Sequence, residues 1–167
     1  MPSMNFKRID LDLLEPSFRD LQFELVARCI ALGFNYCAIR GYDTYGAQMA
    51  LWAKGRTMPG PKVTNAQGGQ SAHNFGLAVD YVLDKNPNLP GIQPDWAKSG
   101  YKVLCEEAKK LGLHSGEGYG DLPHVAARGY VTASDMKLLD IAWNKSSGDT
   151  LTRLKQVWKT LRHERTP

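Results

Sequence analysis

The spacing of apolar residues predicts a helix, a strand and a second helix in the first third of the chain. In residues 16–32, apolar side chains recur every three or four positions, which is typical of one buried helical face. Pro16 suits the first turn of this helix, and Gly33 suits its end. Residues 36–42 predict a strand, and residues 44–54 predict a helix that lies between a capping threonine and a glycine.

A second pattern, strict alternation, predicts a strand over residues 76–83. In that strand Gly76, Ala78 and Asp80 would share one face, and the larger apolar residues between them would point to the other. Two of the smallest side chains therefore leave space on the face that carries the carboxylate. We expect a further short strand near residues 124–128.

The remaining segments are predicted to form loops and helices. Residues 57–72 and 84–94 are rich in glycine, proline and polar residues, so they predict surface loops, and the first of them would form one wall of a substrate cleft. Apolar stripes predict helices over residues 95–111, 134–144 and 150–162, the first of them capped by Asp95.

The composition is consistent with these predicted elements and is ordinary for a globular protein. The chain has 167 residues, 43% of them hydrophobic, and a net charge of +4, as expected of one soluble globular domain. We expect no transmembrane helix, and the segment Met1–Asp12 does not resemble a secretory signal. The three cysteines lack metal-type spacing, which favours a reducing compartment. No nucleic-acid motif or aromatic-basic pattern is present, so nucleic acid is not an expected partner.

Candidate chemistry centres on two histidines and an aspartate. His73 precedes the strand that carries Asp80, and His124 lies three residues after Asp121. Two imidazoles and one carboxylate suit zinc and leave a fourth position for water, the pattern of a catalytic site. Asp121 would then be the acid–base residue, provided that it lies in a turn. Ser71 would be a hydroxyl that orients a ligand or substrate group.

Two alternatives compete for these roles. His114 is another histidine in the same part of the chain, but it lacks an acid at a useful spacing. Glu117 competes with Asp121 as the base. The residues alone leave both alternatives open.

The pattern Ser71-x-His73-x-x-Gly76-x-Ala78-x-Asp80, followed by Asp121-x-x-His124, resembles the zinc D,D-/L,D-peptidases that cut peptidoglycan stem peptides. These include VanY-type carboxypeptidases and phage L-alanyl-D-glutamate endopeptidases. The resemblance covers residues 15–126. It implies an α+β fold with a small, mainly antiparallel sheet, helices packed around it and a zinc site at the sheet. It also favours Asp121 over Glu117 and His124 over His114.

The resemblance further implies a zinc metallopeptidase that cleaves the L-Ala–D-Glu bond of stem peptides. Without an export signal, the enzyme would act as a phage endolysin that stays in the host cytoplasm until release to the cell wall. The alternatives are a D,D-carboxypeptidase acting on D-Ala–D-Ala termini and a non-catalytic, zinc-stabilised wall-binding module.

The sequence departs from the family pattern at Asp43, where an arginine would steady the scissile carbonyl oxygen. Arg40 or Arg56 would replace that charge, with Arg56 as a substrate-binding residue. The alternative is that Arg40 only pairs with Asp43 or another acid.

For domain organisation, residues 1–130 would form the catalytic core, and residues 131–167 a helical extension packed on the same domain. Residues 151–167 hold five Lys or Arg and one Glu, so the basic excess is local. Such a helix would hold the enzyme against anionic envelope polymers, or its basic face would simply be solvated. We expect a monomer.

Overall fold

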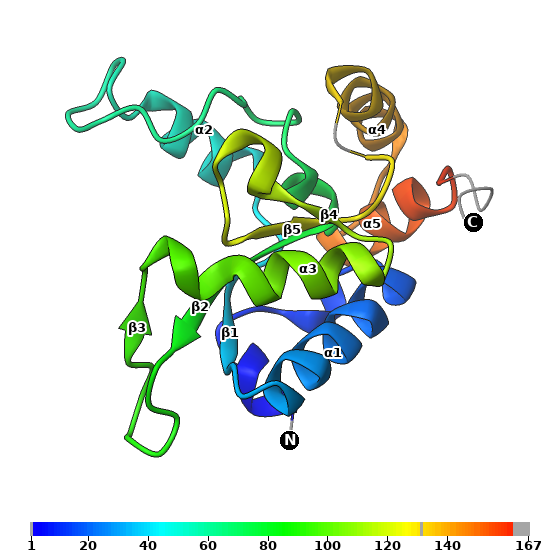
Figure 1. The fold of residues 1–167 in the computed structure, drawn as a ribbon. Coiled ribbons are helices and arrows are strands. Elements are labelled where there is room, and N and C mark those ends of the chain that lie inside the picture. The colour runs from blue at the N-terminus through cyan, green and yellow to red at the C-terminus, as the bar shows by residue number, and fades with distance from the viewer. Residues whose placement is uncertain (1, 131, 162–167) are drawn as a thin grey trace.

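The computed structural model describes residues 2–130 and 132–161 and confirms the predicted α+β fold (Figure 1). Within these residues five α-helices surround a small antiparallel sheet of five strands. The helices are α1 (Pro16–Ala31), α2 (Tyr45–Ala53), α3 (Lys102–Lys110), α4 (Ala133–Lys145) and α5 (Thr150–Trp158). The strands are β1 (Tyr36–Arg40), β2 (Ala78–Asp84), β3 (Pro94–Asp95), β4 (His114–Ser115) and β5 (His124–Ala126). Short 3-10 helices, η1 (Pro2–Phe6), η2 (Leu11–Leu13), η3 (Ala72–Phe75), η4 (Lys98–Tyr101) and η5 (Gly116–Tyr119), connect them.

The order of the sheet places β2 at its centre. The strands run β1-β2-β5-β4, and β3 pairs with the far end of β2. Between Ala38, which lies opposite Tyr81, and Arg40, which lies opposite Asp80, β1 contains one extra residue. This irregularity is a β-bulge: β1 advances by two residues where β2 advances by one.

The main core fills the space between the sheet and the helices α1 and α3. Val79, Tyr81 and Leu83 of β2 point into it, together with Val125 of β5. Because side chains alternate along a strand, Asp80 must point to the opposite face. The predicted separation of the carboxylate from the larger apolar residues of this strand is therefore present.

A second apolar cluster joins α4 and α5 to the segment just before β2. Met136, Leu154 and Trp158 pack with Phe75 and Leu77 in this cluster. The indole Nε1 of Trp158 also donates a hydrogen bond of 2.8 Å to the carbonyl oxygen of Phe75. The two C-terminal helices thus pack on the segment that leads into the central strand.

Several predicted element boundaries are wrong. Gly76 does not begin the strand: it ends η3 in the left-handed region, with φ +66°, and β2 begins two residues later. Asp95 does not cap a long helix, because it pairs with Leu83 as part of β3, and α3 begins only at Lys102. The last helix ends at Trp158 rather than at residue 162, which lies outside the described residues.

One simpler expectation is met. The described part of the chain contains no helix with the length and apolar character needed to span a bilayer. Cys29, Cys37 and Cys105 are all buried with free thiols, so they serve as small core residues.

Candidate metal centre

The register of the sheet places three side chains in a row across its open face. Asp80 of β2 lies opposite Arg40 of β1 on one side and opposite His124 of β5 on the other. Directly opposed residues of antiparallel strands point to the same face and come within contact distance. The row therefore gathers a guanidinium, a carboxylate and an imidazole from residues that are far apart in the sequence.

His73 reaches the same carboxylate from η3, the turn of helix before β2. The hydroxyl of Ser71 accepts a hydrogen bond from the backbone N–H of His73 and so caps this short helix. The His73 side chain is only 1% exposed, and its Nδ1 lies 2.7 Å from the carbonyl oxygen of Gly41. Ser71 thus positions His73 through the backbone, and it also lines the adjacent cavity.

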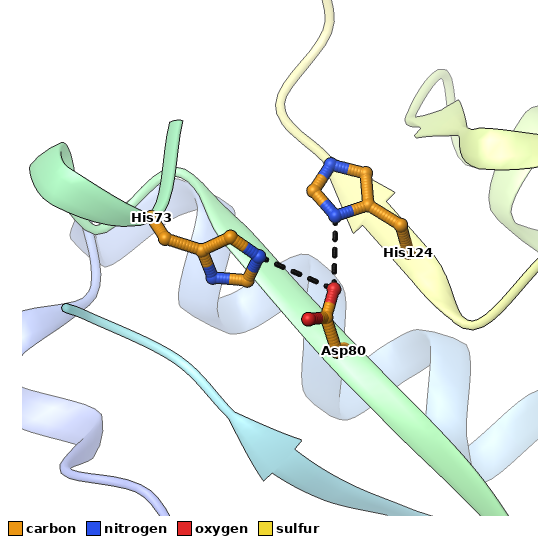
Figure 2. Close-up of side chains that lie close together, drawn as sticks. All are labelled: His73, Asp80 and His124. Carbon is orange, nitrogen blue, oxygen red and sulfur yellow. Dashed lines mark hydrogen bonds and ion pairs between the residues drawn. The ribbon is translucent and has the colours of Figure 1, made fainter. Parts of the chain in front are cut away.

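The three predicted ligands converge, as Figure 2 shows. Asp80 Oδ1 lies 3.2 Å from His73 Nε2 and 2.9 Å from His124 Nδ1. One candidate ligand atom from each residue lies within 4.8 Å of the other two. Burial disfavours the charged form of Asp80, but the adjacent imidazoles outweigh it and hold the pKa of this carboxyl well below its usual range.

The hydrogen bonds of His73 show that this cluster fits a cation. A carbonyl oxygen only accepts, so His73 Nδ1 must donate its proton to Gly41. In neutral His73 the lone pair of Nε2 then faces the ionised carboxylate of Asp80. Two acceptors in contact need a proton or a metal ion between them. Two imidazole nitrogens and one carboxylate oxygen form a donor set typical of zinc. In His73 the second ring nitrogen is held by the carbonyl of Gly41, as is common for metal-binding histidines.

Asp121 lies beside this cluster, in the turn that the sequence requires. Its carbonyl oxygen accepts the backbone N–H of His124 at 3.1 Å, and its own N–H donates to Gly116 at 2.9 Å. Partial burial, followed by the negative charge of Asp80, raises the pKa of the Asp121 carboxyl above its usual value. A carboxylate with a raised pKa that does not belong to the ligand group suits proton transfer.

Gly116 fixes the position of this turn, which gives a first prediction. A Cβ at residue 116 would overlap the carbonyl oxygen of Asp121 and lie 3.1 Å from the Cβ of His124. Gly116→Ala should therefore displace both residues. We expect it to lower kcat/KM for peptide hydrolysis at this candidate site by about a hundredfold, the effect of a displacement of about 1 Å in an active site. Gly118→Ala is the matched control in the same loop, because a Cβ there meets nothing within 4 Å. Metal content is measured in both variants alongside kcat/KM. Equal losses of kcat/KM in Gly116→Ala and Gly118→Ala would contradict this role of Gly116.

A cavity of about 240 Å³ opens over the cluster. Besides the predicted residues, the residues that line it include Gln48, Tyr119, Tyr130 and Met136. Gln48 lies within the segment that resembles the peptidase family, but the sequence assigned it no role. The other three carry no motif, and only the folded chain brings them to the cavity.

Of the two arginines predicted at the site, the structure brings only Arg40 to it. Its guanidinium contacts Asp43 at 2.6 Å, Gln48 at 2.8 Å and Asp80 at 3.3 Å. Arg40 therefore pairs with Asp43, the simpler alternative, and also touches a predicted metal ligand. Arg56 is not among the residues that line the cavity: it lies over the ring of Trp52 and donates to nearby backbone carbonyls.

The rival residues lie outside the cluster. His114 stacks on Tyr119 with ring centroids 5.8 Å apart and is not part of the three-residue group. Burial, followed by the charge of His124, lowers the pKa of His114. Glu117 forms an ion pair with Lys109 at the surface and does not line the cavity.

The small antiparallel sheet carries a His-Asp-His group, and the carboxyl of Asp121 lies beside this group without belonging to it. This arrangement is suited to a peptide hydrolase. A family model described as "VanY: D-alanyl-D-alanine carboxypeptidase" matches residues 12–116. The chain belongs to this family of peptidoglycan peptidases, which in general depend on zinc. The match ends before Asp121 and His124, so the geometry, and not the family model, places these two residues at the site.

A curated relative supports the same family. The peptidoglycan L-alanyl-D-glutamate endopeptidase CwlK of Bacillus subtilis (strain 168) is 32% identical over 120 residues, which cover 67% of this chain and 72% of that protein.

Proposed function

We propose that this protein is a zinc-dependent endopeptidase that cleaves the L-Ala–D-Glu bond of peptidoglycan stem peptides. The observation that carries the proposal is the contact of Asp80 with both His73 and His124 beside the separate acid Asp121. The similarity to an L-alanyl-D-glutamate endopeptidase supports the choice of bond.

His73, Asp80 and His124 would hold the ion. When bound, zinc supplies Lewis-acid polarisation of the substrate carbonyl and activation of water. Asp121 accepts a proton from the attacking water and returns it to the leaving amine, a role that its raised pKa favours. The buried Gly41 contact holds the His73 ring in one orientation throughout.

Arg40 has a positioning role in this proposal. Its guanidinium is shared between Asp43, Gln48 and Asp80, so its contacts hold the Asp80 carboxylate in place. The same group lines the cavity, where its charge also favours a developing negative charge on substrate oxygen. Ser71, which caps the helix that carries His73, lines the cavity as well.

A second candidate function is hydrolysis of the D-Ala–D-Ala terminus. The description of the matching family model, a D-alanyl-D-alanine carboxypeptidase, favours it. Both reactions would use the same metal-binding group and the same acid. The choice of the bond that is cleaved therefore depends on substrate contacts farther from the metal centre. A lytic role in a phage-infected host, contact of the basic C-terminal helix with the envelope and a monomeric state stay predictions.

Product analysis separates the two reactions. Purified murein digested with zinc-loaded protein should give fragments with a new D-Glu amino terminus, detected by mass spectrometry. Release of free D-alanine without such fragments would favour the carboxypeptidase. Wall binding without any hydrolysis, at a confirmed metal content, would contradict both and support a non-catalytic binding module.

A further inference from the structure

A second cavity, of about 560 Å³, adjoins the cavity over the metal centre. Ala66, Gln70 and Met136 line both, so the two spaces share a common wall. The second cavity lies between the segment 66–70 and the first turns of α4, which stands beside the chain that returns from α2 toward η3 in Figure 1. We call this second cavity the α4 groove.

The walls of the α4 groove are held close together. The Tyr45 hydroxyl donates a hydrogen bond of 2.7 Å to Asp140 of α4, and the Tyr45 ring stacks on Trp143 with centroids 5.6 Å apart. Gly69 lies so near that a Cβ there would come within 2.6 Å of Asp140 Oδ1 and 2.9 Å of the Tyr45 ring. The groove therefore lies where α2 and the loop pack closely against α4.

Its charge is carried by two side chains of α4. Lys137 lines the groove, is exposed, and has no ion-pair partner within residues 2–130 and 132–161. Asp140 also lines it, but one carboxylate oxygen already accepts the hydroxyl of Tyr45. The ammonium of Lys137 is thus the charged group of the groove that is left to pair with an incoming anion.

We infer that the α4 groove extends the substrate cleft and holds the part of the stem peptide that follows the cleaved bond, with the C-terminal carboxylate of that part beside Lys137. This inference rests on the proposed function. Stem peptides carry their free carboxylates on the C-terminal side of the L-Ala–D-Glu bond. Because the two cavities share lining residues, the α4 groove is the neighbouring space that such a chain would enter on leaving the metal centre.

The inference also assigns a substrate-binding role to α4, one of the two C-terminal helices. The family model matches residues 12–116, whereas Met136 and Lys137 lie on α4, beyond that range. The first of the two C-terminal helices, α4, would form one wall of the cleft. Substrate preference would then depend on residues outside the part of the chain that the family model matches.

The test uses the zinc-loaded full chain and two synthetic peptides. Both contain the L-Ala–D-Glu bond with a blocked amino terminus and two further stem residues, and they differ only in a C-terminal carboxylate or carboxamide. The wild type should cleave the carboxylate form with about threefold to fivefold higher kcat/KM, the size expected for an exposed charge pair. Lys137→Met should lose this preference, and raised salt should reduce it in the wild type.

Lys145→Met is the matched control, because Lys145 is an exposed lysine of the same helix that does not line the groove. It should keep the wild-type preference. A Lys137→Met variant that still prefers the carboxylate, a wild type without preference, or equal losses in both variants would overturn the inference while leaving the proposed function intact. A zinc-loaded wild type that cleaves neither peptide nor murein would overturn the proposed function and the inference with it.

Discussion

His124→Ala is expected to lower murein hydrolysis by about a thousandfold or more, because a lost metal ion removes several kcal/mol of transition-state stabilisation. His124 supplies one of the three candidate ligand atoms, and its side chain is only 14% exposed. The remaining His73 and Asp80 leave two ligands, fewer than the three protein ligands of catalytic zinc sites. Metal content after dialysis and the rate of murein hydrolysis measure the two effects separately.

His114→Ala provides the control for this experiment. His114 pairs with β5 from the neighbouring strand but lies outside the ligand group, so this variant should keep one zinc ion per chain. Added zinc should restore a chelated wild type and a chelated His114→Ala variant, but not His124→Ala. A His124→Ala protein that retains both its zinc and its activity would rule out the ligand set.

Asp121→Asn should lower kcat by about a hundredfold to ten-thousandfold, the usual contribution of a general acid–base residue. The amide keeps the size of the side chain and the backbone hydrogen bonds with Gly116 and His124, so the turn should persist. Zinc content should be unchanged, because Asp121 is not part of the ligand group. Kinetics on one defined peptide, together with metal analysis, measure both quantities.

Glu117→Gln is the matched change of a nearby carboxylate. Glu117 pairs with Lys109 at the surface, so its loss should change kcat by less than about twofold, as expected for an exposed ion pair. If Asp121→Asn retains wild-type kcat while Glu117→Gln loses it, the two acids have exchanged roles and the proposed proton path is wrong.

The amphipathic helix α1 could be predicted almost to the residue, because a long periodic stripe with a proline at one end and a glycine at the other determines it locally. The start of β2 could not. Alternation continues through Gly76, but its left-handed conformation ends η3 two residues before the strand begins. The predicted helix start at Asp95 is wrong for a similar reason, since Asp95 belongs to β3, which forms only by pairing with β2.

At the site, the local motif was enough to predict that His73 and Asp80 lie together, because they are seven residues apart on one turn and one strand. The place of Gln48 and Met136 at the cavity depends on tertiary packing that leaves no local pattern. Arg56 was predicted as a replacement for the charge of the family arginine that is missing at Asp43. Charge does not distinguish a cleft residue from one that lies over a neighbouring tryptophan.

The bulge in β1 has a consequence for the polarity of the whole sheet face. Ile39 is the extra residue, and Ala38 on its near side points into the main core. In a regular strand Arg40, two positions along, would point the same way as Ala38 and bring a guanidinium among apolar side chains. The single inserted residue instead turns that cation outward, toward Asp80. One irregular step at an edge strand thus decides on which side of the sheet the positive charge resides.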